Sequence, residues 1–330
     1  MAKGATDCRA WRSTPDPFHS STRSAAKISR SNQRSLNCSR SCSGNAQTVM
    51  TLSYRKLILV VLAVLTAIGG QTAFASLAIC IYHDQRIYIA SDSLVHGIGE
   101  KDFKAPKIFP IGNTTWVSIT GYYGSTVRDR KTGQAVSRIF FPIELGRICK
   151  EANASKQLVT LEDKINSINQ RFALIYSEGL DTLLSTKVDP RTIEATRLYF
   201  VGYDPSTKSF FGKSYLYQGK GRPTIETRFV RNADNNEPDI SFQGESHFLS
   251  RLLTSSDSAF TTLRSENLNK TFSQLLMPDS IVTDQDVKNF ILELFNLHKL
   301  HAASVGPDKG LIGEPYHIYK IMSDKTMKIH

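Results

Sequence analysis

The order of strand and helix patterns along this 330-residue chain predicts an α+β fold. Two strand-like runs rich in β-branched and aromatic residues come first, followed by helical segments, further strands, further helices and a last strand. Because strands and helices come in blocks, this order favours helices layered on antiparallel sheet over alternating βαβ units.

The strand predictions rest on β-rich runs bounded by turn residues. SLAICIYH and RIYIASDS form an expected hairpin around His83, Asp84 and Gln85, and Gly112-Asn113 marks the turn of a second pair. The expected strands are residues 76–83, 86–93, 104–112, 114–121, 195–204, 209–218, 224–230 and 316–322.

The helix predictions rest on apolar residues at helical spacing. Within LEDKINSINQRFALIYSE, Ile165, Ile168, Phe172 and Ile175 fall on one face. Thr283-Asp284 supplies a start signal ahead of the last helix. The expected helices are residues 141–153, 161–178, 248–253 and 287–304.

Composition divides the chain into three regions. Residues 1–49 are rich in Ser, Arg and Asn, so we expect a disordered extension or a stretch that precedes the true translation start. Residues 50–75 read as a signal peptide, with MTLSYRK as positive n-region, LILVVLAVLTAIGG as apolar h-region and QTAFA as cleavage site. Residues 76–330 are then one globular domain of a secreted or periplasmic protein. The alternative is an uncleaved membrane anchor, since the apolar stretch reaches spanning length.

The net charge of +11 does not indicate a nucleic-acid partner, because it is unevenly distributed. Residues 1–75 hold 10 Lys and Arg against 2 Asp. The remaining 31 basic and 28 acidic residues leave only +3, too little for the basic footprint of a nucleic-acid-binding domain.

Cysteine and histidine spacings predict no metal site. Cys80 and Cys149 lack a metal-type pair spacing, and whether they form a disulfide is left open. His298 and His301 lie three residues apart on an expected helix, but no third ligand is indicated, so core or solvated histidines are favoured. We expect neither a metal ion nor another cofactor.

Ser76 is the residue on which the functional prediction depends. Cleavage after Ala75 would give Ser76 a free α-amine, whose ordinary pKa of about 7.7 to 8.0 suits a general base. A serine hydroxyl needs such a base to act as a nucleophile. The alternative is that a small residue at this position merely suits signal peptidase.

Three segments together resemble the proteasome β-subunit-like family of N-terminal nucleophile (Ntn) hydrolases. IYIASDS resembles the A-A-D-S-like end of the family's second strand, and KAPKIFPI its K-K-I-x-x-I element. RLYFVGYD is similar to the family's I-A-G-Y-D strand, with weaker echoes in SITG and AASVG. The resemblance covers nearly all of residues 76–323 and implies a four-layer αββα sandwich, with two antiparallel sheets between helical layers.

The resemblance also implies a set of catalytic residues. Ser76 takes the nucleophile position, Asp92 the aspartate that ends the second strand, and Lys107 the active-site lysine. Gly121 takes the position whose N–H lines the oxyanion hole, and Ser304 the serine of the late D-x-x-S-G-G element. In these positions the lysine charge would favour a neutral amine and a developing alkoxide, and the aspartate would orient the lysine.

This sequence departs from the family pattern at four positions. Ser76 replaces the usual threonine, and His301 and Val305 replace the aspartate and first glycine of the late element. Ala75 replaces the glycine usual before the nucleophile in self-processing members, and it suits signal peptidase rather than autolysis.

The sequence therefore predicts an exported Ntn-type hydrolase, similar to threonine peptidases, that cleaves a peptide or a small amide through Ser76. The alternative, which His301 and Val305 favour, is a non-catalytic exported module for binding or assembly. A homo-oligomer is left open. A membrane partner is expected only if the signal segment stays attached.

Overall fold

A computed structural model describes residues 76–95, 103–128, 135–184, 195–244, 246–278, 280–305 and 312–330. The extension predicted at 1–49 and the signal peptide predicted at 50–75 lie outside these residues. Among the helices that the structure describes, none is long and apolar enough to cross a membrane.

The first sheet is antiparallel and begins with the predicted hairpin. Its strand order is β12 (Asp239–Gly244), β1 (Leu77–His83), β2 (Arg86–Ser91), β13 (His317–Ile321) and β14 (Thr326–Lys328). Asp84 and Gln85 both have positive φ angles, 46° and 54°, as a tight two-residue hairpin turn requires. The hairpin prediction is therefore confirmed, whereas β12 was missed by the sequence interpretation.

The second sheet is also antiparallel and carries the middle of the chain. Its order is β11 (Thr224–Arg231), β10 (Ser209–Tyr217), β9 (Thr196–Asp204), β6 (Thr115–Thr120) and β5 (Ile108–Pro110). Two further two-stranded pairs join β3 (Leu94–Val95) to β4 (Phe103–Lys104), and β7 (Gly124–Arg128) to β8 (Ala135–Phe140). The single strand predicted over 104–112 is thus divided into short pieces.

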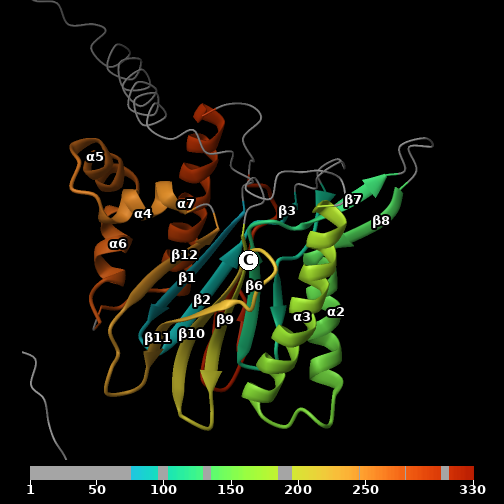
Figure 1. Cartoon of the computed structure of the whole chain (residues 1–330). Helices are drawn as coiled ribbons and strands as arrows, with labels where there is room; N and C mark the ends of the chain where they lie inside the picture. The colour runs from blue at the N-terminus through green and yellow to red at the C-terminus, as the bar shows by residue number, and fades with distance from the viewer. Residues whose placement is uncertain are drawn as a thin grey trace, which may run out of the picture. The chain divides into compact units, whose positions relative to one another are not determined.

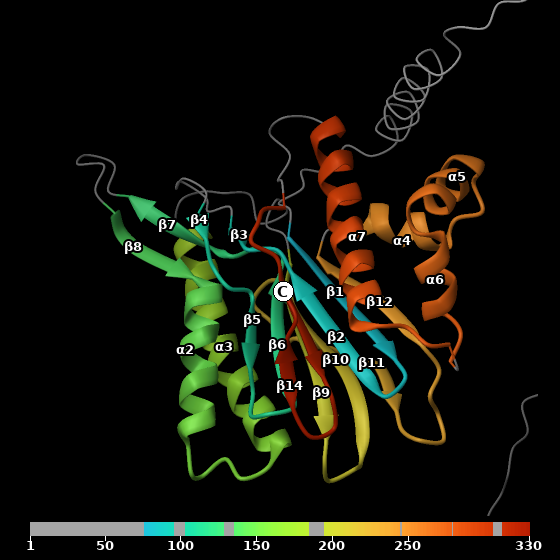
Figure 2. The same cartoon turned by 180° about the vertical axis from the view of Figure 1, so that it is seen from behind.

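Helices lie on both sides of the sheets. Figures 1 and 2 show α2 (Phe141–Ala154) and α3 (Leu161–Leu184) on one side. On the other side lie α4 (His247–Thr254), α5 (Ser258–Asn267), α6 (Asn269–Leu275) and α7 (Asp284–Val305). The sequence interpretation did not include α5 and α6.

Three hydrophobic clusters hold these elements together. One cluster packs the four helices from α4 through α7 against the outer face of the first sheet. A second cluster packs α2 and α3 against the outer face of the second sheet. A third, which includes Cys80, Tyr82 and Tyr199, lies between the sheets. The α+β class with two antiparallel sheets is therefore confirmed.

Strand β1 is buried on both faces, and this explains why its sequence does not alternate between apolar and polar residues. Leu77, Ile79 and Ile81 belong to the helix-facing cluster, whereas Cys80 and Tyr82 face the second sheet. Because side chains alternate along a strand, Ser76 falls on the same face as Cys80. The chain thereby directs this serine between the two sheets.

The two cysteines in the described part of the chain are both free and buried. Cys80 lies between the sheets, and Cys149 is a buried residue of α2 in the second cluster. Burial raises the pKa of the Cys149 thiol to about 12 and raises that of Cys80 further. Both thiols are therefore protonated at neutral pH and act as small apolar groups.

Candidate active site

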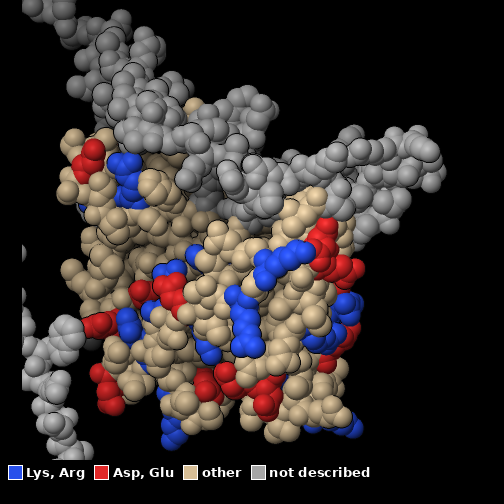
Figure 3. Space-filling model, in the orientation of Figure 1, with Lys and Arg blue, Asp and Glu red and all other residues tan. Residues whose placement is uncertain are grey.

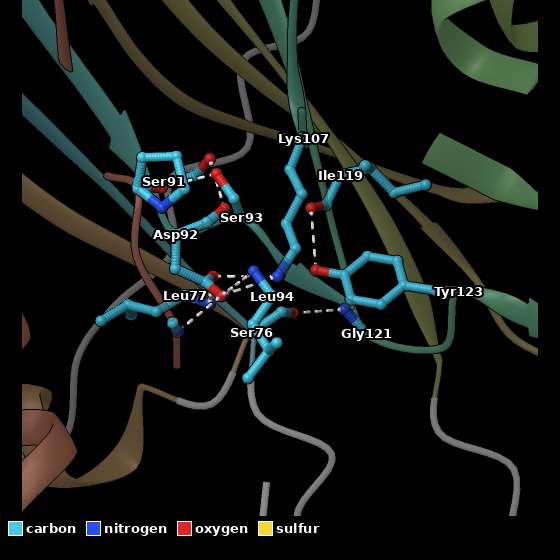
Figure 4. A network of polar contacts seen from close by, with 12 residues as sticks. Ser76, Leu77, Ser91, Asp92, Ser93, Leu94, Lys107, Ile119, Gly121 and Tyr123 are labelled. Atoms are coloured by element: carbon cyan, nitrogen blue, oxygen red, sulfur yellow. Dashed lines mark hydrogen bonds and ion pairs between the residues drawn. The ribbon is translucent and has the colours of Figure 1, made fainter. Parts of the chain in front are cut away.

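Ser76 lies against the backbone at the end of β6. Its side chain is 0% exposed, and its hydroxyl Oγ accepts a hydrogen bond of 3.0 Å from the Gly121 N–H (Figure 4). An N–H donor beside a hydroxyl nucleophile is in position to stabilise the oxyanion that forms when the hydroxyl attacks a carbonyl.

Gly121 can make this contact because it has no side chain. Its φ angle is +92°, in a region that residues with a Cβ rarely adopt. A Cβ at this position would come within 2.0 Å of the Ala195 carbonyl oxygen. Close approach of β6 to the start of β9 therefore requires glycine here.

Asp92 and Lys107 form a fully buried ion pair beside Ser76. The Lys107 ammonium Nζ donates to both carboxylate oxygens of Asp92, at 3.0 Å and 2.9 Å, and both side chains are 0% exposed. Asp92 also accepts the N–H of Leu77, the residue that follows Ser76, at 3.2 Å. The carboxylate thus fixes the lysine and the start of β1 to each other (Figure 4).

Further backbone donors hold Asp92 in place. The N–H groups of Leu94 and Gly313 donate to its Oδ2 at 3.1 Å and 3.4 Å. Gly313 reaches the site from the segment before β13, far away in the sequence. A carboxylate held by several N–H groups and an ammonium has little freedom to rotate, so the position of Lys107 is fixed as well.

The Lys107 ammonium lies in an environment that disfavours its charge. Burial lowers the pKa of Lys107 below its ordinary value, and Asp92 opposes this shift. The ammonium also lies 4.7 Å from the centroid of the Tyr123 ring, a cation–π contact that favours the charged form. Through Asp92, Lys107 is thus connected to the Leu77 N–H, one residue after Ser76.

The structure brings together four of the five predicted catalytic residues: Ser76, Asp92, Lys107 and Gly121. They come from the start of β1, the end of β2, the segment before β5 and the end of β6. Ser304 is not joined to them by any hydrogen bond or ion pair of the described residues. It lies exposed near the end of α7, and its hydroxyl donates to the His301 carbonyl at 2.7 Å.

His301 and His298 belong to the contact between α7 and α4. The His301 ring stacks on Phe248 at 4.1 Å. His298 is 2% exposed, and neither of its ring nitrogens has a hydrogen-bond partner among the described residues. Burial lowers the pKa of each imidazole to about 4, with a further contribution to His301 from the charge of His247. In the described part of the chain, no group of three metal-ligating side chains is present.

The buried His298 predicts that acid destabilises the protein. Its folded-state pKa of about 4 lies below the ordinary 6.5, so the unfolded chain takes up the proton first as pH falls. The neutral, buried His298 contributes to the free energy of unfolding above pH 6.5, and this contribution is lost as the pH falls towards 4. Between pH 7 and pH 5 the loss is about 2 kcal/mol.

Urea unfolding at these two pH values measures the effect. His298→Leu is expected to reduce the pH dependence by that amount, whereas Lys299→Leu, at an exposed position on the same helix, keeps the parental slope. An unchanged slope in His298→Leu would contradict the assignment.

The sequence interpretation missed a polar group on the other side of Ser76. Arg197, in β9, donates from Nη1 to the Gln243 side-chain oxygen at 2.9 Å. Gly244 follows Gln243 with a φ of +85°, and a Cβ on it would lie 2.1 Å from the Ser76 carbonyl oxygen. β12 was not predicted as a strand, so no sequence signal placed Gln243 near the serine.

The charged surface is mixed on the face shown in Figure 3. Lys and Arg side chains alternate there with Asp and Glu over the described part of the chain. This distribution agrees with the small net charge of residues 76–330.

Comparisons with known proteins give little further information. No family model matches the chain, and no curated protein matches it. One similar solved structure is "Anbu (ancestral beta-subunit) from Yersinia bercovieri", with 9% identity, a TM-score of 0.44, and coverage of 77% of this chain and 86% of that chain. Another is "Helical Assembly of the Anbu Complex from Pseudomonas aeruginosa", with 10% identity, a TM-score of 0.46 and the same coverage.

The prediction that the chain belongs to the proteasome β-subunit-like family of Ntn hydrolases is wrong. No family model matches, and the similar structures share only 9% and 10% of their residues with this chain, at TM-scores too low to support an argument. The motifs that suggested membership are short segments at strand ends and turns, and likeness at this level does not establish function. The chemistry of the site must therefore follow from its own contacts.

Proposed function

We propose that the protein is an exported hydrolase that cleaves amide or peptide bonds with Ser76 as its nucleophile. The observation that carries the proposal is the hydrogen bond of 3.0 Å from the Gly121 N–H to Ser76 Oγ, at a serine placed next to a buried Lys107–Asp92 pair. A nucleophile, an oxyanion donor and a fixed cation in one place are the parts that acyl transfer requires.

The proposed base is the α-amine of Ser76 itself, created when the bond after Ala75 is cut. The amine takes the hydroxyl proton as Oγ bonds to the carbonyl carbon, directly or through one water. It then gives the proton to the leaving amine as the scissile C–N bond breaks. Water hydrolyses the resulting acyl ester on Oγ, releases the acid and restores Ser76.

Gly121 and Lys107 stabilise this reaction in different ways. When Ser76 Oγ bonds to the carbonyl carbon, the Gly121 N–H transfers its hydrogen bond to the new oxyanion nearby. The Lys107 charge favours the neutral, proton-accepting form of the amine and the developing alkoxide. Asp92 is a positioning residue, because it holds the lysine and the Leu77 N–H without contacting the hydroxyl.

The proposal includes the processing and location of the chain. Residues 50–75 act as a signal peptide whose removal in the export pathway leaves residues 76–330 as the mature, secreted or periplasmic domain. The four-layer αββα order is part of the same proposal, and the three hydrophobic clusters support it. The substrate is a peptide or small amide, and a homo-oligomer is compatible with the site.

Substitution of the nucleophile tests the proposal. In a chain that begins at Ser76, Ser76→Ala is expected to lower kcat for a fluorogenic amide by roughly 10³-fold or more, because no other hydroxyl can form the acyl ester. Ser76→Thr, which keeps a hydroxyl and an α-amine, is expected to keep measurable turnover. Ser265→Ala, at an exposed position on α5, is the control.

Each outcome discriminates between functions. Equal turnover by the parent and Ser76→Ala would contradict the role of Ser76. No turnover and no covalent labelling by the parent would favour a non-catalytic binding or assembly module.

A further inference from the structure

The order of the strands places two polar pairs on opposite sides of Ser76. β1 lies between β12 and β2 in the first sheet, and β6 lies between β9 and β5 in the second. Asp92 follows β2 and Lys107 precedes β5, whereas Gln243 lies in β12 and Arg197 in β9. Hydrogen bonds and ion pairs link the sheets at β2–β5, β1–β6 and β12–β9 in turn. The Arg197–Gln243 pair therefore flanks Ser76 on the side away from Lys107.

The Arg197–Gln243 pair is connected to Ser76 through the neighbouring residues Gly244 and Thr120. Gly244 adjoins Gln243, and a Cβ on Gly244 would come 2.1 Å from the Ser76 carbonyl oxygen and 3.1 Å from Thr120 Cβ. Thr120 in turn precedes Gly121, the oxyanion donor, and pairs with Arg197 across β6 and β9. One run of contacts thus joins Ser76, Thr120 and Arg197.

The Arg197–Gln243 pair and the neighbouring Thr120 carry hydrogen-bonding atoms that have no partner among the described residues. Arg197 Nε, Gln243 Nε2 and Thr120 Oγ1 are each buried, and none of them has a hydrogen bond within the part of the chain that the structure describes. Buried polar atoms nearly always have partners, and leaving one without a partner destabilises the fold. Three such atoms beside one nucleophile indicate groups that are kept available for a ligand.

Arg197 has no direct ion pair with an acidic side chain among the described residues. Within the described part of the chain, its guanidinium donates to the neutral Gln243, and the nearby Glu226 forms its ion pair with Arg228 at 3.0 Å. Burial and the charge of Arg228 lower the pKa of Arg197, and the charge of Glu226 partly opposes this shift, but a guanidinium remains protonated in proteins. Lys107 differs from Arg197 because its ammonium donates to both carboxylate oxygens of Asp92.

We infer that Arg197, Gln243 and Thr120 bind a carboxylate of the substrate, so that the enzyme prefers peptides or amides with an acidic group next to the scissile bond. A guanidinium, an amide N–H and a hydroxyl are suited to the several acceptor sites of a carboxylate. Binding would neutralise the charge of Arg197 and satisfy the three buried atoms. This inference rests on the proposed function and specifies its substrate class.

The test compares two fluorogenic substrates that differ only in charge, acetyl-Ala-Ala-Glu-aminomethylcoumarin and acetyl-Ala-Ala-Gln-aminomethylcoumarin. With the chain that begins at Ser76, kcat/KM is expected to be at least about tenfold higher for the Glu substrate, since charged hydrogen bonds to one buried group contribute that much. Arg197→Gln is expected to remove the preference, so that kcat/KM becomes about equal for the two substrates.

Two other variants keep the test interpretable. Thr120→Val removes only a hydroxyl and is expected to lower the Glu preference about threefold, even if Arg197→Gln fails to fold. Arg228→Gln removes a nearby positive charge that is bonded to Glu226, and it is expected to keep the preference. An equal loss in Arg228→Gln and Arg197→Gln would overturn the inference in favour of a general charge effect.

A binding measurement separates this inference from the proposed function. Calorimetry with acetyl-Ala-Ala-Glu-amide and acetyl-Ala-Ala-Gln-amide requires no catalysis. Tighter binding of the Glu peptide that is lost in Arg197→Gln supports the carboxylate site even if neither substrate is hydrolysed. Equal binding of the two peptides, or equal hydrolysis of the two substrates, overturns it even if Ser76 proves to be the nucleophile.

Discussion

Lys107→Met is expected to lower the free energy of unfolding by about 3 kcal/mol or more and to abolish hydrolysis. The substitution leaves the Asp92 carboxylate buried at 0% exposure without its cation, and breaking a buried ion pair by removing one partner costs about 3–5 kcal/mol. Chemical denaturation of the chain that begins at Ser76 measures the loss. Lys213→Met is the control, because Lys213 is partly exposed and lies 3.6 Å from Glu162, so its loss is expected to cost about 0 to 1 kcal/mol.

The double variant Asp92→Asn/Lys107→Met separates folding from chemistry. Removing both charges relieves the buried carboxylate, so most of the lost stability is expected to return. Hydrolysis is expected to stay absent, because the cation beside Ser76 is still missing. A double variant as unstable as Lys107→Met would contradict the pairing, and one that regains activity would contradict a catalytic role for Lys107.

A chain that keeps Ala75 in front of Ser76 is expected to hydrolyse amides about 10²- to 10⁴-fold more slowly than the chain that begins at Ser76. The added residue turns the α-amine of Ser76 into an amide, which cannot accept a proton at neutral pH. Both chains can be made with a cleavable tag and compared on one fluorogenic amide.

The dependence of kcat/KM on pH, measured for both of these chains, provides the control. For the chain that begins at Ser76, kcat/KM is expected to rise with pH as the amine loses its proton, near its ordinary pKa of about 7.7 to 8.0 or below it because of the Lys107 charge. Equal activity of the two chains would contradict the use of the α-amine as base.

The parts of the site that local sequence determines could be predicted. The hairpin over 76–93 is specified by two β-rich runs and a two-residue turn, and the turn fixes Asp92 opposite the start of β1. Lys107 and Gly121 follow at the ends of neighbouring short segments. Their placement was inferred from a family resemblance, and the structure shows the contacts although the family assignment failed.

The parts that depend on distant contacts could not be predicted. β12 has a short sequence, DISFQG, with few apolar residues, and it becomes a strand because the edge of β1 pairs with it. Arg197 and Gln243 meet only because the two sheets pack face to face. The role of Ser304 stays a prediction that rests on a motif position alone, because its described hydrogen bond stays within α7.

The central claim is that export creates the catalytic residue, and intact mass of the exported protein tests it most directly. The full chain is expressed with its leader, recovered from outside the cytoplasm and weighed before and after treatment with a hydroxyl-directed sulfonyl fluoride. The predicted result is a chain that begins at Ser76 and gains one adduct, which peptide mapping places on Ser76. A mature chain that begins at another residue, or an adduct elsewhere, would contradict the claim.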